Sequence, residues 1–159
     1  MTEIKLLLLI IIANGVPVLL SKLLQKRLDT PLDFNRLFID GRPLFGVTKT
    51  LRGVIAAILV TSLAAVLLNF EFMLGFVIAA LAMLGDLLTS FIKRRCNMPP
   101  SSRALGLDQI PESLLPMLAC HSLLELDWRS VLTVVVLFFI AELVLSGLFY
   151  RLHIRKRPY

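Results

Sequence analysis

The sequence FEFMLGFVIAALAMLGDLLTSFI, at residues 70–92, is long and apolar enough to cross a membrane as one helix, since about 20 such residues span the hydrocarbon core. Four more apolar runs lie around it, filled with leucine, isoleucine and valine and without the alternation of a strand. Because a helix satisfies its own backbone hydrogen bonds in lipid, we predict an all-α membrane protein. The expected bundle has about five transmembrane helices, at residues 4–23, 54–68, 70–92, 113–126 and 131–149.

The composition supports this class. Of the 159 residues, 57% are hydrophobic and the mean hydropathy is +0.84, whereas a soluble domain is about 45–50% apolar. The length allows one domain, so we expect a single integral membrane domain over residues 1–159. The net charge of +6 could indicate nucleic acid, but in a membrane protein it more often reflects basic loops. We therefore expect a lipid bilayer around the chain and no nucleic-acid partner.

The distribution of cations predicts the orientation. With five spans, every lysine and arginine except Lys5 and Arg129 falls on one side of the membrane, and the positive-inside rule makes that side cytoplasmic. The cytoplasmic loops are then residues 24–53 and 93–112. The N-terminus lies outside and the C-terminus lies in the cytoplasm, so we expect a multi-pass protein of the cell membrane.

An acid lies late in the third run, where burial is costly: Asp86 would cost about 2.5–3.5 kcal/mol at the bilayer centre on insertion scales. At about 100° per residue, Ser90 and Lys93 lie on the same helix stripe as Asp86, and Arg94 lies at its edge. The stripe presents a carboxylate, a hydroxyl and two cations, from the membrane outward. Taken alone, Asp86 fits a functional acid and a structural partner for a snorkelling lysine equally well.

A second acidic cluster precedes the fourth run, where Asp108 and Glu112 bracket Pro111. Proline and acids both favour the first turn of a helix, so one interpretation is a capped helix start. The other is an acidic ligand that faces Asp86 across a cytoplasmic cleft. Two acids from different spans could hold Mg²⁺, which takes one or two carboxylates together with phosphate oxygens.

The loop PLDFNRLFIDGRPLFGVTKTLRG, residues 31–53, is long for a connection between spans, and loops of this length are often functional. Its cations could hold a polyphosphate, or they could only enforce topology and contact anionic lipid. Composition alone favours the second interpretation.

Gly41 and Gly46 have the spacing of a phosphate loop, but the lysine comes two residues late, at Lys49, and no strand precedes it. We therefore exclude a P-loop ATPase. The motif of the CDP-alcohol phosphotransferases does not fit either.

Five motifs in order resemble the CDP-archaeol synthase family, the archaeal relatives of phosphatidate cytidylyltransferases. They are ANGVPVL (13–19), PLD (31–33), DGRPLFGVTKTLRG (40–53), GDLLTSFIKRR (85–95) and LDQ (107–109). The resemblance covers nearly the whole chain. It implies a five-helix membrane enzyme that moves the CMP group of CTP onto a lipid phosphate, similar to archaetidic or phosphatidic acid, and releases pyrophosphate. It also implies Mg²⁺ as the cofactor.

The resemblance assigns roles residue by residue. The two metal-binding acids correspond to Asp86 and Asp108, with Glu112 as a further candidate ligand, and Lys93 joins the two aspartates as a catalytic residue. The residues implied in substrate binding are Asn14, Asp40, Arg42, Lys49, Thr50, Arg52, Ser90, Arg94 and Gln109. One departure from the family pattern is Pro111, which stands where we would expect an aspartate.

The implied chemistry joins two anions, so charge must be neutralised before they approach. Lys93 and Arg94 would contact the reacting phosphorus or the leaving pyrophosphate, and Lys49 and Arg52 would hold the polyphosphate.

The alternative is a non-catalytic membrane protein, structural or regulatory, that retains the synthase fold. The presence of Pro111 favours this alternative. CTP-dependent stabilisation separates the two. A thin bundle of five helices is also compatible with a homodimer.

Overall fold

Five α-helices form the regular structure in the computed structural model, which describes all residues except 26, 100, 101, 103 and 152–159. The described residues contain no strand beyond two isolated β-bridges. Lys26, Arg103, Arg155, Lys156 and Arg157, which the orientation argument uses, lie outside the described residues. The helices are α1 (Thr2–Leu24), α2 (Leu51–Leu67), α3 (Phe72–Arg95), α4 (Gln109–Leu123) and α5 (Trp128–Arg151).

Three of these helices are long and apolar enough to cross a membrane, counted over the described part of the chain: α1, α3 and α5. Helix α2 is apolar but has 17 residues, and α4 has 15. The all-α membrane class is thereby confirmed, while the orientation of the termini stays a prediction. Helix α4 begins four residues before the predicted span, at Gln109, so that Pro111 and Glu112 lie in its first turn.

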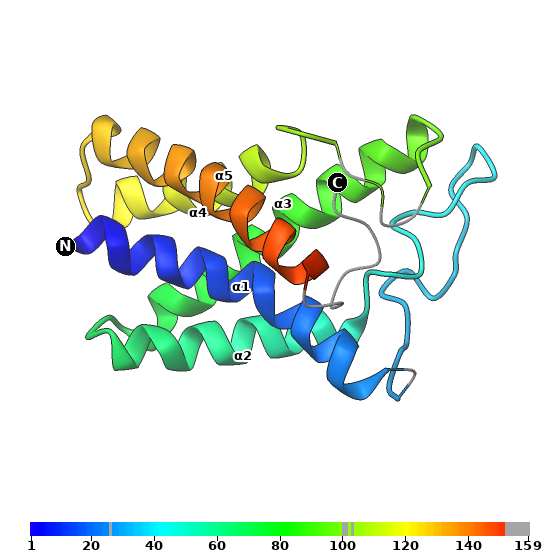
Figure 1. The fold of residues 1–159 in the computed structure, drawn as a ribbon, viewed down its shortest axis with the longest axis horizontal. Coiled ribbons are helices and arrows are strands. Elements are labelled where there is room, and N and C mark those ends of the chain that lie inside the picture. Colours follow the sequence, from blue (N-terminus) through cyan, green and yellow to red (C-terminus); the bar gives the residue numbers. More distant parts are fainter. Residues whose placement is uncertain (26, 100–101, 103, 152–159) are drawn as a thin grey trace.

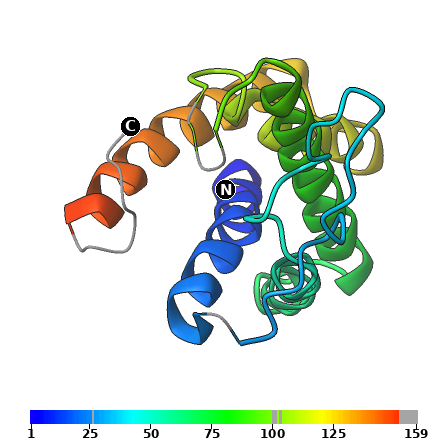
Figure 2. The same cartoon turned by 90° about the vertical axis from the view of Figure 1, so that its right-hand side faces the viewer.

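The helices run side by side along the long axis, and their connections gather at two ends (Figure 1). The short α2–α3 and α4–α5 connections lie at the same end as the N-terminus, whereas the loops that follow α1 and α3 lie toward the other end. Helix α1 contacts each of the other four helices. Seen along the bundle, it lies in the centre with the others arranged around it (Figure 2).

Local chemistry explains where α2 begins and ends. The hydroxyl of Thr50 accepts a hydrogen bond from the Gly53 backbone N–H at 3.3 Å, which satisfies one of the free donors of a helix start. Past the C-terminal end, Asn69 has a φ of +63°. Asparagine tolerates this left-handed conformation better than most residues, and it commonly terminates a helix.

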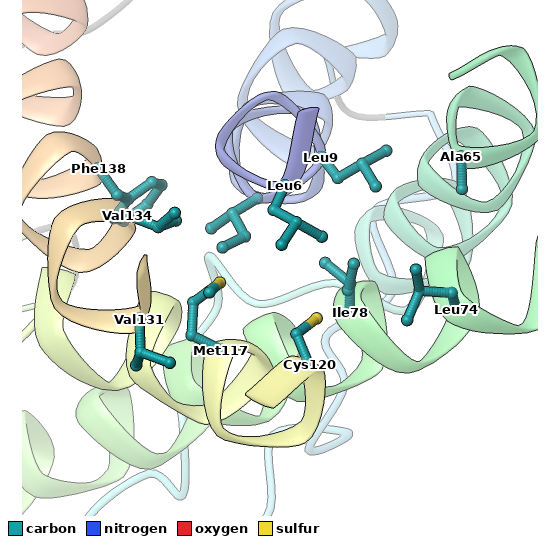
Figure 3. Packing of buried hydrophobic residues seen from close by; sticks show 11 residues of the cluster. Leu6, Leu9, Ala65, Leu74, Ile78, Met117, Cys120, Val131, Val134 and Phe138 are labelled. Carbon is teal, nitrogen blue, oxygen red and sulfur yellow. The ribbon is translucent and has the colours of Figure 1, made fainter. Parts of the chain in front are cut away.

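The apolar core takes residues from all five helices, at the end of the bundle that carries the N-terminus. Leu6 of α1 points toward Ile78 of α3 and Met117 of α4, whereas Leu9 points toward the side of α2, where Ala65 lies, and Phe138 of α5 lies on the opposite side of α1 (Figure 3). Each of these side chains is at most 1% exposed. This cluster fixes α1 against α3, α4 and α5, and so fixes where the other end of α3 lies.

Glycine allows α3 to approach its neighbours closely at two positions. A Cβ on Gly75 would lie 2.6 Å from the Ala65 Cβ of α2, and a Cβ on Gly85 would lie 2.5 Å from the Pro111 carbonyl oxygen of α4. Both are far inside normal contact distance. The Gly85 contact involves backbone, which cannot move aside as a flexible side chain can, so it sets the spacing between α3 and the start of α4.

We expect Gly85→Ala to lower the stability of the folded protein by about 1–3 kcal/mol, because the added methyl group overpacks a backbone contact. The measurement is thermal unfolding of the purified protein in detergent. Gly147→Ala is the matched control, since a Cβ at Gly147 meets nothing within 4 Å. Equal melting temperatures for the two variants would contradict the close α3–α4 contact.

Candidate active site

The loop between α1 and α2 is folded around one buried carboxylate. Asp33, which is 5% exposed, accepts hydrogen bonds from the backbone N–H groups of Asn35, Phe45 and Gly46 at 3.0, 3.0 and 3.1 Å. Burial alone would raise the pKa of the Asp33 carboxyl, but these donors stabilise its charged form, and the net result is a lowered pKa. Asp33 therefore ties the two halves of the loop together.

The same loop delivers a cation to the helix bundle. The Lys49 ammonium nitrogen lies 2.5 Å from both carboxylate oxygens of Asp86 on α3. Desolvation would lower the pKa of Lys49, but the attraction of Asp86 and its hydrogen bond outweigh it, with smaller contributions from Glu112 and Asp108, and the pKa of Lys49 is raised. The predicted stripe residue and the predicted loop cation are thus in direct contact.

A second carboxyl group joins this pair from α4. Glu112 is 7% exposed, and its carboxyl group lies close enough to that of Asp86 for the two to interact. The close α3–α4 contact at Gly85 accounts for their proximity, because the residues involved are sequence neighbours of Asp86 and Glu112. Two carboxylates in contact repel when both are ionised, so this cluster favours cations, and Lys49 is the one that the chain itself supplies.

A second ion pair lies at the start of α4. The Lys93 nitrogen is 2.6 Å from Oδ1 of Asp108, and both side chains are about one-tenth exposed. The other Asp108 oxygen accepts the backbone N–H of Ala104 at 3.0 Å. Asp108 therefore contacts Lys93 and its own loop, whereas Asp86 contacts Lys49 and Glu112.

Three more predicted residues are buried near these pairs. Ser90 is 3% exposed and Arg94 5%, and Arg94 donates to the Pro99 carbonyl at 2.8 Å. Gln109 is fully buried and accepts the Gly106 N–H at 2.8 Å. The Arg94 Nε and the Gln109 Nε2 have no hydrogen-bond partner among the described residues. Buried donors without partners are uncommon, and they are available to an anionic ligand.

Other residues predicted to bind substrate make local contacts instead. The Asn14 side chain donates to the Ile10 carbonyl one turn earlier at 3.0 Å, and Thr50 caps α2. Arg52 donates to the Gln25 carbonyl at 2.7 Å and to Asp29 at 2.8 Å. The Arg52 contacts join the start of α2 to the segment that follows α1. Among the contacts of the described residues, none joins Asn14, Thr50 or Arg52 to Asp86.

Asp40 and Arg42 contact the last residue of α3. Asp40 Oδ2 lies 3.1 Å from the Arg95 Nε, and the Arg42 guanidinium donates to the Arg95 carbonyl. Arg95 also donates to the Pro43 carbonyl at 2.6 Å. Apart from Asn14, Thr50 and Arg52, the predicted residues thus form an inner group with the Asp86 and Asp108 ion pairs and an outer group, Asp40 and Arg42, at Arg95.

The inner group suits a magnesium ion by the chemistry of its donors. No cluster of three or more His, Cys, Asp or Glu side chains that could hold a metal occurs in the described residues. Mg²⁺ needs only one or two carboxylates when substrate phosphates and water complete its shell. Asp86 and Glu112 supply two, and the Lys49 ammonium already occupies a cation position between the Asp86 oxygens.

Sequence reasoning gave no individual role to two residues of this region, Asp33 and Arg95. Asp33 lies in the PLD motif but was given no role, and Arg95 is the third cation of the KRR run. Glu142 of α5 lies close enough to Glu112 for their charges to interact. The signal for Arg95 was its place after Lys93 and Arg94 in the last turn, whereas nothing in the sequence indicated which acid it would meet.

Comparison with known proteins identifies the family. The CarS-like family, described as CDP-archaeol synthase, matches residues 2–159. The chain belongs to the CDP-archaeol synthase family. The CDP-archaeol synthase of Sulfurisphaera tokodaii is 35% identical over 136 residues, which cover 82% of each chain. That of Pyrobaculum calidifontis is 34% identical over 153 residues, covering 93% of this chain and 91% of its own.

A solved structure supports the same assignment. It is described as an intramembrane enzyme for archaeal membrane lipids biosynthesis, and it is 30% identical to this chain. The two superpose with a TM-score of 0.71 over 90% of this chain and 91% of the other. Membership of the CDP-archaeol synthase family confirms the predicted enzyme class, a CTP-dependent nucleotidyltransferase.

The lowered pKa of Asp33 predicts how acid affects the loop. The charged carboxylate contributes stability above its unfolded pKa of about 3.9, and this contribution is lost as the pH falls through the lower folded-state pKa. We expect Asp33→Asn to destabilise the protein at pH 7 and the difference from the parent to shrink as the pH falls below about 4. Thermal unfolding between pH 7 and 2.5 measures it.

The control for this experiment is Asp127→Asn, which alters an exposed carboxylate at the other end of the bundle. It should follow the parent at every pH. A difference between Asp33→Asn and the parent that stays constant down to pH 2.5 would show that the Asp33 charge contributes nothing.

Proposed function

We propose that the protein transfers the CMP group of CTP to the phosphate of an archaeol-type lipid, forming CDP-archaeol and pyrophosphate. The observation that carries the proposal is the cluster of Asp86, Glu112 and Lys49, in which two helices and a loop bring two carboxyl groups and a cation together. Family membership supplies the reaction class. The lipid is taken from the name of the relatives, CDP-archaeol synthase.

For this reaction the protein side chains have to position the two substrates and neutralise their negative charge. An oxygen of the lipid phosphate forms a bond to the α-phosphorus of CTP, and the bond from that phosphorus to the β-phosphate oxygen breaks. The electron pair leaves with pyrophosphate. The attacking phosphate is already ionised near neutral pH, so no strong general base is required. Mg²⁺ bound at Asp86 would neutralise phosphate oxygens and stabilise the charge that develops during transfer.

In this proposal the carboxylates bind the metal ion and the cations bind the phosphates. Asp86 and Glu112 are the proposed carboxylate ligands, because Glu112 lies next to Asp86, whereas Asp108 is held by Lys93 and by the Ala104 N–H of its own loop. Lys49 pairs with Asp86 in the free protein and is available to contact the polyphosphate. Lys93 and Arg94 would bind the reacting phosphate or the leaving pyrophosphate, for which a guanidinium is well suited.

The remaining proposals concern placement. We propose one integral membrane domain whose Asp86 end faces the cytoplasm of a cell membrane, because the loops that carry most of the cations lie at that end of the bundle (Figure 1) and cations favour the cytoplasmic side. Lipid tails would enter between the helices, which leaves the head group level with Asp86. A homodimer stays a prediction.

The decisive experiment is an assay of the purified protein in detergent with CTP, Mg²⁺ and a lipid phosphate. We expect a CDP-lipid to form, faster with ether-linked archaeol phosphate than with ester-linked phosphatidic acid. Asp86→Asn should lower the rate by more than about a hundredfold, because the charge that holds the metal is lost. Asp127→Asn, at the opposite end of the bundle, should match the parent.

Two results would overturn the proposal in different ways. Absence of any CDP-lipid together with no thermal stabilisation by CTP would favour a non-catalytic protein that retains the fold. Product formation that is unaffected by Asp86→Asn would place the chemistry elsewhere in the molecule.

The choice of metal ligands has its own test. We expect Glu112→Gln to raise the Mg²⁺ concentration for half-maximal activity by about tenfold or more, and Asp108→Asn to change it less. Both variants remove one carboxylate charge from the start of α4, so each controls for the other. The measurement is the initial rate as a function of Mg²⁺ at saturating CTP. A larger effect of Asp108→Asn than of Glu112→Gln would instead identify Asp108 as the second metal ligand.

A further inference from the structure

One side chain joins the long loop between α1 and α2 to the end of α3. Arg95 lies against two aromatic rings, with its guanidinium carbon 4.9 Å from the centroid of Phe38 in the loop and 4.7 Å from that of Phe91 on α3. The same guanidinium pairs with Asp40 and donates to the Pro43 carbonyl. We call these five residues the Arg95 latch.

The latch holds a hairpin that has its own internal order. Leu37 and Pro43 form an antiparallel bridge, the Phe38 N–H donates to the Arg42 carbonyl at 2.8 Å, and Gly41 at the turn has a φ of +74°. Because the hairpin is ordered by its own contacts, the Arg95 latch acts on it as a unit. Loss of the Arg95 side chain would leave the hairpin attached to α3 by the Arg42 bond to the Arg95 carbonyl and by the Phe38–Phe91 ring contact alone.

The chain between the hairpin and Lys49 is short and is also tied down. Asp33 binds the backbone of Phe45 and Gly46, and the Lys49 carbonyl accepts the Leu32 N–H at 2.7 Å. Only five residues lie between Pro43, held by Arg95, and Lys49, held by Asp86. The two attachments of the loop to α3 are therefore mechanically linked.

We propose that Arg95 is a positioning residue for the transfer reaction, and that it acts through the loop by keeping Lys49 at Asp86. The inference rests on the proposed function, since it assigns the purpose of holding Lys49. Arg95 does not touch Asp86 itself. The proposal also gives Asp40 a role, as the loop's acidic partner of Arg95, beside the role in substrate binding that the family resemblance implies.

The contacts of the Arg95 latch are weak enough for the loop to detach from α3 and dock again. The Arg95 side chain is 21% exposed and that of Asp40 36%, and an ion pair this exposed contributes little alone. Stacking on two rings adds to it, and the planar guanidinium can bind the carboxylate and the Pro43 carbonyl together, which an ammonium cannot do with the same geometry. When only a fraction of molecules is latched, the apparent affinity for CTP falls by that fraction.

The experiment compares Arg95→Ala, Arg95→Lys and Arg36→Ala in the full-length protein. Arg36 is the matched control, because it is an exposed cation of the same loop. Its backbone carbonyl accepts the Leu44 N–H at 3.4 Å, an interaction that Arg36→Ala retains. The first readout is hydrogen exchange of residues 37–50 in the absence of substrates. The second is the split between KM for CTP and kcat.

We expect Arg95→Ala to speed exchange in residues 37–50 and to raise KM for CTP by about tenfold while kcat changes less than about threefold, because saturating CTP restores the docked loop. Arg95→Lys should fall between Arg95→Ala and the parent, and Arg36→Ala should match the parent. Exchange and KM in Arg95→Ala equal to those of Arg36→Ala would overturn the proposal. So would a fall in kcat at unchanged KM, which indicates direct participation.

The two readouts also separate this inference from the proposed function. Hydrogen exchange can be measured without turnover. If the parent forms no CDP-lipid but Arg95→Ala still exchanges faster, the Arg95 latch holds the loop and only its role in the transfer reaction is disproved. A parent enzyme that turns over normally while its loop exchange is insensitive to Arg95 would remove the latch and leave the proposed function intact.

Discussion

The organisation of this protein depends on the need to compensate carboxylates at one end of an apolar helix bundle. Asp86, Asp108 and Glu112 are all buried or nearly so, and a buried charge without a partner is strongly unfavourable. Lys49 and Lys93 provide that compensation for the two aspartates. Since Lys49 comes from a loop rather than from a helix, the same electrostatic requirement that stabilises the site also determines where the loop must fold.

The second constraint is steric. Helix α4 can bring Glu112 to Asp86 only because Gly85 leaves room for the backbone of Pro111. A proline in the first turn of a helix removes an N–H that would have no intrahelical partner in any case. Pro111, which departs from the family pattern, therefore fits both the helix start and the contact. We propose that Glu112, one residue later, supplies the carboxylate that the pattern leads us to expect at this position.

The prediction from sequence was most successful where a single physical rule dominates. The number of helices and the all-α class follow from apolar runs and the cost of free backbone groups in lipid, and the stripe of Asp86, Ser90 and Lys93 follows from helix periodicity. The boundaries of α4 were less predictable, because its polar first turn is buried by contact with α3 rather than by its own hydrophobicity. The family was identifiable because its motifs occur in order along nearly the whole chain.

The sequence by itself determined the membrane class, the helices and the set of charged residues available for chemistry, because these depend on composition and on spacing within one helix. Only the tertiary structure decided how the charges are paired: Lys49 with Asp86, Lys93 with Asp108, and Arg95 with Asp40. In each of these pairs the partners are 15 or more residues apart in the chain. Such pairs depend on how helices pack and where a long loop returns, and a short loop motif contains no information about either.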